Sequence, residues 1–342
     1  MNLQYHYVVL NYPDTLGWKM DNPDGYYDIC IEDLYDKDNI TVVNYPLEGK
    51  PLIFKVLHRL LLTCKRRLGS GRIIDYIIRK FYPMYIPKQE SSKNLCFVFI
   101  SDVWDINFMR YLKARYLKCK IVMALRDLVR TKWFYKELVE SNLVDYWMSY
   151  DKGDCEEYGM SYFSEFESKI ELSTNNNVPY SDVFFTGRAK QRLPKLVECY
   201  DYLTSLGLKC LFIILDAPEE QKEERDGILY TNTYMTYRRM LEYSIRSKCL
   251  LDINQDGATG YTSRFLEAVI YNKLLLTNTI GIKKHPLYDS RYIKEFQSIK
   301  EVSLSFFESK ENIKYKYNNE FSPLRFIEKV NEVVSQTEKE DA

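Results

Sequence analysis

A glycine and three cationic residues follow a strand-like run in the second half of the chain, in the order Thr186-Gly187-Arg188-Ala189-Lys190-Gln191-Arg192. Arginine offers a planar fork of donors and lysine a point charge, and both suit a phosphate or diphosphate. Positive charge at a helix start opposes the helix dipole, and an anionic ligand relieves that conflict. We therefore predict that Gly187, Arg188 and Lys190 bind phosphate. The alternative is a solvated basic first turn.

A second glycine-containing segment, residues 255–268, also follows a strand-like run and then opens a helix. Gly260 precedes the helix start at Thr262 or Ser263, where exposed backbone N–H groups form a cradle for phosphate. Glu267, one turn into the helix, is in the right place to accept hydrogen bonds from a ribose diol. The alternative is an ordinary capped helix with a solvent-facing acid.

A third polar segment, residues 230–234, follows another strand of the same half. Its Thr231 and Tyr234 are candidates to line a nucleobase pocket, or else they are turn residues with a partly buried tyrosine. In the first half, Asp14 and Asp102 lie just after two strand-like runs, so they place carboxylates at one sheet edge. Turn or helix-capping aspartates are the alternative for these two.

The elements that must position these residues alternate between strand-like and helical patterns. Strands are predicted at residues 7–10, 27–31, 40–44, 95–100, 120–125 and 144–149, and later at 182–186, 209–215, 227–231, 249–253 and 273–277. Helices are predicted at residues 107–116, 131–141, 151–159, 194–206, 234–246, 262–271 and 323–336. Strand, helix, strand with short connections indicates parallel sheets and an α/β fold.

A polar, turn-rich stretch at residues 160–182 interrupts this rhythm, which then restarts. The sequence therefore predicts two Rossmann-like domains, residues 1–165 and residues 166–342, facing a cleft. The last helix, residues 323–336, is expected to pack back onto the first domain.

Composition excludes several classes of protein. The 342 residues contain 48 Lys and Arg against 48 Asp and Glu, so a basic nucleic-acid binder is not indicated. The eight cysteines show no CxxC pair and the three histidines are scattered, so neither a metal site nor a resident cofactor is predicted. No apolar run reaches the ~18 residues of a membrane span, which favours a cytoplasmic protein.

The second half resembles the donor domain of a GT-B glycosyltransferase. The resemblance rests on FFTGRAKQRL, YRRMLEYSIRSKCLLDINQDG and GYTSRFLEAVIYNKLLLTN, which together cover about residues 182–280. It is closest to bacterial enzymes of lipopolysaccharide or capsule synthesis, with Arg-x-x-Glu-Ala in the helix. In the first half, the α/β pattern and FVFISDVWD carry a weaker resemblance.

The resemblance implies that Arg188 and Lys190 hold a donor diphosphate, that Thr262 and Ser263 present the helix start to phosphate, and that Glu267 binds ribose. The nucleotide sugar would be a substrate, and its transfer to a glycan or lipid-linked acceptor would need no metal. An inverting reaction needs a general base, for which Asp14 is the first candidate and Asp102 the second. Gly260 stands where retaining members carry a further glutamate.

Three other interpretations stay open. Asp36-Lys37-Asp38 resembles the metal site of a GT-A enzyme. A nucleotide-sugar epimerase shares the GT-B fold, and product analysis of a donor without acceptor would separate it. A non-catalytic two-domain sugar-binding protein is a third class, against which the cationic strand end speaks.

Residues 55–80 concentrate positive charge, with eight Lys and Arg against a single acid, Asp75. Leucines and isoleucines recur between the cations, which predicts two basic amphipathic helices separated at residues 69–71. An anionic membrane surface is a candidate partner, so the enzyme would attach peripherally to the inner face. The alternative is a basic outer face over the sheet, which could serve a homodimer contact.

Overall fold

The computed structural model describes residues 3–11, 26–44, 47, 49–68, 71–86, 93–100, 106–129, 135–172, 177–254, 260–308 and 312–340. The chain divides into two compact units. Unit 1 comprises residues 1–23, 31–164 and 323–342, and unit 2 comprises residues 24–30 and 165–322. The predicted boundary at residue 165 instead leaves residues 24–30 in the first domain and residues 323–342 in the second, with the last helix expected to pack back onto the first domain.

Unit 1 contains a parallel sheet of six strands in the order β2-β1-β3-β4-β5-β6. The strands are β1 (His6–Leu10), β2 (Ile40–Val43), β3 (Leu95–Phe99), β4 (Lys120–Leu125), β5 (Tyr146–Ser149) and β6 (Ser161–Tyr162). The helices are α2 (Leu52–Leu68), α3 (Arg72–Arg79), α4 (Tyr82–Tyr85), α5 (Ile106–Arg115), α6 (Tyr135–Ser141), α7 (Lys152–Tyr158) and α11 (Pro323–Glu340), with the 3-10 helix η1 (Glu32–Leu34).

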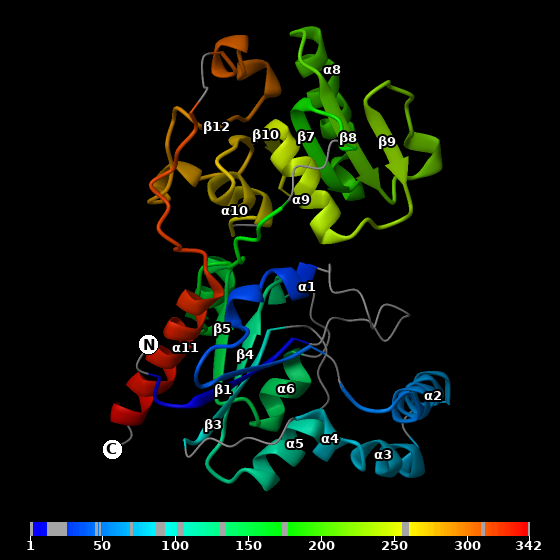
Figure 1. Ribbon diagram of the computed structural model, residues 1–342, viewed down its shortest axis with the longest axis vertical. Helices are drawn as coiled ribbons and strands as arrows, with labels where there is room; N and C mark the ends of the chain where they lie inside the picture. Colours follow the sequence, from blue (N-terminus) through cyan, green and yellow to red (C-terminus); the bar gives the residue numbers. More distant parts are fainter. Residues whose placement is uncertain are drawn as a thin grey trace. The chain divides into compact units, whose positions relative to one another are not determined.

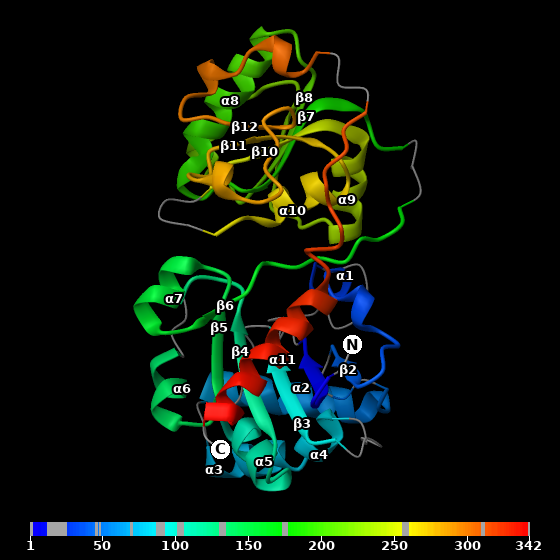
Figure 2. The same cartoon turned by 90° about the vertical axis from the view of Figure 1, so that its left-hand side faces the viewer.

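Helices lie on both faces of the sheet of unit 1 (Figures 1 and 2). Successive side chains of a strand point to opposite faces of its sheet. Val8, Phe97 and Ile121 belong to one buried cluster that also contains Phe108 and Leu112 of α5. On the other face, the Tyr7 hydroxyl donates to Asn331 Oδ1 of α11 at 2.9 Å. Burial on both faces explains why these strands are almost continuously apolar in sequence.

Unit 2 contains a second parallel sheet, in the order β12-β11-β10-β7-β8-β9. The strands are β7 (Ser181–Arg188), β8 (Cys210–Leu215), β9 (Ile228–Thr231), β10 (Ser247–Asp252), β11 (Leu274–Thr277) and β12 (Ile293–Glu295). The helices are α1 (Tyr26–Ile29), α8 (Leu193–Ser205), α9 (Tyr237–Arg246) and α10 (Ser263–Ile270). The 3-10 helices are η3 (Lys190–Arg192), η4 (Glu219–Gln221), η5 (Ile282–Lys284), η6 (Ile299–Glu301) and η7 (Leu304–Phe306).

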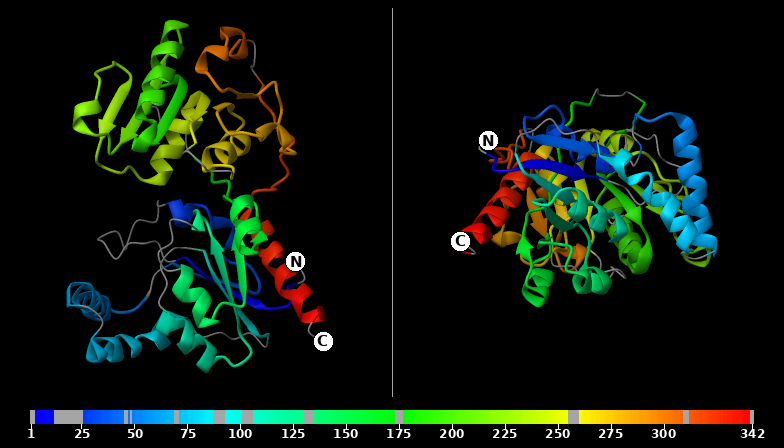
Figure 3. Two further views of the ribbon diagram at one scale, coloured as in Figure 1. Left: turned by 180° about the vertical axis from the view of Figure 1, so that it is seen from behind. Right: turned by 90° about the horizontal axis from the view of Figure 1, so that it is seen from below.

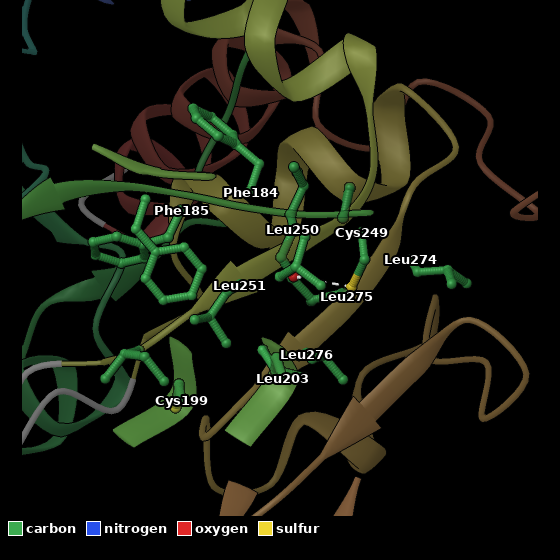
Figure 4. Packing of buried hydrophobic residues seen from close by; sticks show 14 of the residues in the cluster. Phe184, Phe185, Cys199, Leu203, Cys249, Leu250, Leu251, Leu274, Leu275 and Leu276 are labelled. Carbon is green, nitrogen blue, oxygen red and sulfur yellow. Dashed lines mark hydrogen bonds between the residues drawn. The ribbon is translucent and has the colours of Figure 1, made fainter. Parts of the chain in front are cut away.

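Neighbouring phenylalanines of β7 divide the core of unit 2 between its two helical layers (Figure 4). The ring of Phe184 stacks on Tyr243 of α9, with centroids 5.6 Å apart. Phe185 instead contacts Phe212 of β8 at 5.7 Å, and Phe212 meets Tyr200 of α8 at 5.4 Å. The alternation that defines a strand therefore positions α9 and α8 on opposite faces of the sheet.

The predicted α/β fold with two Rossmann-like domains is confirmed by these two parallel sheets. When the strands of each sheet are numbered from 1 to 6 along the chain, their spatial order in unit 2 is 3-2-1-4-5-6, which is the order of dinucleotide-binding sheets. The spatial order in unit 1 is 2-1-3-4-5-6. The cleft between the domains stays a prediction.

One predicted strand, residues 27–31, is wrong. Its residues form α1 and the turn that follows, and Ile29 packs with Ile170, Tyr237 and Leu241 in unit 2. A short apolar run is compatible with a strand or with a buried helical turn, and its tertiary contacts decided here. In the described part of the chain, no helix is long and apolar enough to cross a membrane.

Candidate functional site

The first glycine-containing segment of unit 2 and residues 260–268 of the second lie at the point where the strand order reverses, whereas residues 255–259 are outside the described part of the chain. β7 and β10 are hydrogen-bonded neighbours, with Cys249 opposite Val183 and Leu250 opposite Phe184. The chain leaves β7 into η3 and leaves β10 toward α10, so both segments lie at the carboxyl edge of this strand pair. Ligands of doubly wound sheets bind in the crevice outside that edge, at the reversal of strand order.

Arg192 joins the two strand ends. Its Nη1 donates to the carbonyl of Ile253, directly after β10, and its Nε donates to the carbonyl of Arg188 at 3.1 Å. The guanidinium also lies 5.4 Å from the ring centre of Phe185. The side chain is partly buried, and this burial lowers the pKa of Arg192.

Gly187 lies directly beside the Arg192 guanidinium. A β-carbon at residue 187 would lie 2.8 Å from Arg192 Nη2, and the side-chain carbon Cζ of Phe185 would lie 3.3 Å away. The glycine predicted to bind phosphate therefore makes room for the Arg192 guanidinium. Any contact that Gly187 makes with a ligand would be through its backbone.

Arg188 and Tyr234, predicted separately, come together on the surface. Arg188 Nε donates to the Tyr234 hydroxyl at 2.6 Å, and the guanidinium lies 5.2 Å from the tyrosine ring centre. The hydroxyl in turn donates to Asp216 Oδ2 at 2.8 Å, and Arg188 Nε lies 3.2 Å from the same oxygen. The Arg188 side chain is 55% exposed, so its charge is accessible to a ligand.

The other predicted residues near this cluster have simpler surroundings. Thr231 ends β9, beside Leu215 of β8, and its Oγ1 accepts from the Thr233 N–H at 3.0 Å. Lys190 is exposed at the start of η3, with a backbone φ of 45°. A left-handed conformation is uncommon for lysine, and it occurs here where the chain turns from β7 into α8.

The side chain of Thr262, at the start of α10, forms hydrogen bonds within the protein. Thr262 is the N-cap, and its Oγ1 accepts from the Phe265 N–H at 3.4 Å. Its side chain also hydrogen-bonds the buried Asp252 carboxyl. Ser263 occupies the first helical position, after the buried Gly260, so the backbone amides at this helix start carry its capacity to bind an anion.

Glu267 lies inside unit 2, so it is not the solvent-facing acid of the capped-helix interpretation, and its carboxylate is not exposed to a ribose. Its side chain is fully buried, and Oε1 accepts from the Tyr237 hydroxyl at 3.1 Å. Oε2 accepts from Ser244 Oγ at 3.0 Å and forms an ion pair with Arg264. Burial raises the pKa of this carboxyl, and the Arg264 charge acts in the opposite direction. Every residue of α10 after Ser263 is buried, which explains the difference.

The sequence missed Asp252, which forms a second buried carboxylate network at the end of β10. Its Oδ2 accepts from Thr277 Oγ1 at 2.9 Å and from Thr279 Oγ1 at 3.3 Å. Burial raises its pKa, while hydrogen bonds from Thr277 and Thr262 and the charges of Arg264 and Arg192 lower it. Asp216 was also missed. The available signal was the same for both, namely an aspartate at the carboxyl end of an apolar strand.

The two candidate bases of unit 1, Asp14 and Asp102, lie outside the described residues. The strands that precede them are neighbours, because Leu10 of β1 pairs with Phe99 of β3. These are also the strands at which the order of this sheet reverses. Just beyond β1, the buried Asn11 donates through Nδ2 to Asn44 Oδ1 at 3.0 Å.

The Asp36-Lys37-Asp38 segment lies in the turn that precedes β2, at the amino end of that strand. Ligand sites of parallel sheets lie at the opposite edge, which does not favour the GT-A interpretation. Within the described residues, no group of three or more His, Cys, Asp and Glu side chains is arranged to hold a metal ion.

Comparison with known proteins finds remote similarity in structure and no match in sequence. No protein-family model matches the sequence, and no curated protein matches it. Among solved structures, it is similar to an α,α-trehalose-phosphate synthase (UDP-forming) from Burkholderia vietnamiensis, with 11% identity, TM-score 0.46, and coverage of 81% of this chain and 84% of that chain. It is also similar to a UDP-GlcNAc 2-epimerase from Methanocaldococcus jannaschii, with 12% identity, TM-score 0.46, and coverage of 96% and 99%. These TM-scores lie below 0.5, so the fold is defined here by the strand order of the two sheets, and a function has to be inferred from the geometry of the site.

Proposed function

We propose that the chain is a glycosyltransferase that takes a sugar from a nucleotide-sugar donor bound to unit 2. The observation that carries this proposal is the position of Arg188, an exposed cation at the strand-order reversal of a 3-2-1-4-5-6 sheet. Lys190 adds a second exposed cation two residues later, and the start of α10 follows the neighbouring strand. This combination suits a diphosphate.

Each predicted residue has a role in this proposal. Arg188 and Lys190 bind the diphosphate, the backbones of Gly187 and Gly260 allow its close approach, and the amides around Thr262 and Ser263 face its charge. Thr231 and Tyr234 line the nucleoside side of the site. Glu267 acts indirectly by holding Arg264, because both of its oxygens are bound inside the protein.

The leaving nucleoside diphosphate would be stabilised by these cations and amides, without a bound divalent ion. Full activity in excess chelator is the expected result, and loss of activity restored by a divalent ion would contradict it. For an inverting transfer, Asp14 and Asp102 are the proposed bases for the acceptor hydroxyl. Near wild-type turnover in both Asp14→Asn and Asp102→Asn would remove them from that role.

The proposed acceptor is a glycan or lipid-linked glycan of a bacterial surface polysaccharide, and the proposed location is the cytoplasm. This finer proposal rests on the sequence resemblance of residues 182–280 to lipopolysaccharide and capsule enzymes. Incubation of the donor with lipid-linked and free oligosaccharide acceptors would test it. Transfer only to an unrelated acceptor would overturn this part of the proposal.

The central experiment is calorimetric titration of UDP, GDP and CMP into the wild type and into Arg188→Ala and Lys190→Ala. Loss of a charge-assisted contact typically costs ~1.5–3 kcal/mol, so we expect roughly ten- to a hundred-fold weaker binding. Lys209→Ala is the matched control, because this exposed lysine precedes β8 at the opposite edge of the sheet. Unchanged affinity in both site variants would reject the site. Conversion of the donor sugar to its epimer, without acceptor, would indicate an epimerase.

A further inference from the structure

The hairpin formed by α2 and α3 in unit 1 exposes an unusual number of large apolar side chains. The exposed fraction is 74% for Leu52, 69% for Ile53 and 58% for Leu60 in α2, and 76% for Ile73 and 62% for Tyr76 in α3. Val56 and Leu57 are 45% exposed. Large contiguous apolar surfaces on a folded protein usually mark an interaction site.

The exposed apolar side chains of α2 lie along one side of that helix. In α2, Leu52, Val56 and Leu60 follow one another at intervals of four residues, so they form a ridge along the helix. Ile53 and Leu57 form the adjacent ridge. α2 and α3 lie next to each other at the side of unit 1 away from α11 (Figures 1 and 3). We define the outer face as Leu52, Ile53, Val56, Leu57, Leu60, Ile73 and Tyr76.

The opposite side of α2 is already committed to the core of unit 1. His58 is buried and hydrogen-bonds the Tyr85 hydroxyl of α4, and its ring lies 5.2 Å from that of Phe81. Lys65 Nζ forms an ion pair with Asp75 Oδ1 at 2.8 Å, which links α2 to α3. The hairpin is therefore held in a fixed orientation, and its outer face is the side left for a partner.

The charge of the hairpin is strongly positive. Between residues 52 and 80 the sequence has eight Lys and Arg and one acid, and that acid, Asp75, is paired with Lys65. Lys55 and Arg59 lie one turn apart beside the ridge that begins at Leu52. A second copy of this chain would bring the same cations against one another, so charge favours an anionic partner.

We propose that the α2–α3 hairpin docks in the plane of an anionic lipid bilayer, with the outer face inserted and the cations at the headgroups. A helix with an aliphatic face flanked by Lys and Arg has the composition of an interfacial membrane helix. Cations near an anionic leaflet attract it, and inserted aliphatic groups add to the binding. The proposal is independent of the glycosyltransferase function.

Vesicle flotation of the full-length protein tests this docking. Binding is expected to phosphatidylcholine vesicles that contain phosphatidylglycerol, and is expected to be weak with phosphatidylcholine alone and at high salt. Lys55→Glu combined with Arg59→Glu should lower the partition coefficient roughly 10- to 100-fold. Leu52→Ser combined with Leu60→Ser should lower it at least tenfold at unchanged charge, which plain electrostatic adsorption would not produce.

Two matched controls separate the outer face from surface changes in general. Ile280→Ser removes an 81% exposed side chain in unit 2, and Lys136→Glu reverses a lysine whose side chain is 89% exposed on α6. Both controls should bind vesicles like the wild type. A circular dichroism spectrum and thermal transition like those of the wild type would show that each variant is folded.

Cys64 offers a direct readout of insertion. It is the one cysteine of the eight that is exposed, and it follows Leu60 by one turn of α2. An environment-sensitive dye on Cys64 should shift its emission to the blue with anionic vesicles, and lipid-bound quenchers in the acyl region should quench it. No flotation at low salt, or flotation unaffected by the Leu52 and Leu60 changes, would overturn the proposal. A dimer in sedimentation velocity that those changes dissociate, without vesicle binding, would assign the face to a second copy.

Discussion

The Arg188 side chain reaches Asp216 across the carboxyl ends of two adjacent strands, with Nε 3.2 Å from Oδ2. Tyr234 closes the cluster, because its hydroxyl accepts from Arg188 and donates to Asp216. Both charged side chains are about half exposed, so the pair adds little stability to the fold. Its expected consequence is for binding, since the carboxylate would compete with an anionic ligand for the same guanidinium.

We expect Asp216→Asn to bind nucleoside diphosphates more tightly than the wild type. Removing one negative charge about 4 Å from the ligand charge is worth about 1 kcal/mol in water, or roughly a fivefold change in affinity. Arg188→Ala should change the affinity in the opposite direction. Calorimetry of both variants at low ionic strength measures the two signs.

Tyr234→Phe is the control for this pair, since it removes the hydroxyl and keeps the ring under the guanidinium. Its affinity should lie between those of the wild type and Arg188→Ala. If Asp216→Asn weakens binding as much as Arg188→Ala does, the carboxylate orients Arg188 and does not compete with the ligand.

Gly187 and Arg192 should behave as a coupled pair. Gly187→Ala places a methyl group 2.8 Å from Arg192 Nη2, so the guanidinium must shift, and this shift disturbs the hydrogen bond from its Nη1 to the Ile253 carbonyl. We expect Gly187→Ala to lower the free energy of unfolding in the wild type and to have a much smaller effect in Arg192→Ala. Urea unfolding of the two single variants and the double variant gives the coupling, expected between about 0.5 and 3 kcal/mol. Strict additivity would show that the two residues act independently.

Much of this fold follows from local patterns, and the site follows from them only in part. The strands β7, β8 and β10 are apolar runs bounded by polar turns, so the sequence predicts both their existence and the edge at which Arg188 lies. The burial of Glu267 could not be predicted in this way, because Arg264 of α10 and Tyr237 of α9 satisfy its carboxylate inside the protein. The Arg264 pair is an i,i+3 contact within α10, but the hydrogen bond from Tyr237 depends on the packing of α9 against α10, which no spacing in the sequence records.

Removing Glu267 should affect stability before it affects ligand binding. The carboxylate is fully buried and pairs with Arg264, and breaking a buried ion pair from one side typically costs about 3–5 kcal/mol. Glu267→Ala should therefore lower the midpoint of urea unfolding strongly. Glu267→Gln should lower it less, because an amide oxygen can still accept from Tyr237 or Ser244.

The double variant Arg264→Met with Glu267→Met is the matched control for the charge. It leaves no unpaired ion in the interior, so it should be more stable than Glu267→Ala. A double variant less stable than Glu267→Ala would show that the unpaired charge is not the main cost. The ribose role would be restored only if Glu267→Ala kept the stability of the wild type and lost its affinity for nucleosides with a ribose diol.

The contribution of Lys273 to the free energy of unfolding of unit 2 should rise with pH in the alkaline range. Burial lowers the pKa of this lysine from 10.5 to about 8, and its Nζ donates to the carbonyls of Ile245 and Ser247. Between pH 8 and pH 10.5 the unfolded chain therefore holds a proton at this site that the folded chain has released. Stability rises with pH wherever the unfolded state binds more protons, so this group adds up to about 3 kcal/mol across that interval.

The measurement is the free energy of unfolding of the wild type and of Lys273→Met at pH 7, 8, 9 and 10. Tyrosine and cysteine ionisation is common to both proteins, so it cancels in the difference between them. We expect the free energy of unfolding of the wild type to rise relative to that of Lys273→Met from pH 8 upward. Below pH 7 the difference between the two proteins should not change with pH. A difference that stays flat up to pH 10 would mean that Lys273 keeps its proton in the folded chain, held by the Ile245 and Ser247 carbonyls. Lys209→Met, at an exposed lysine, controls for loss of a cation.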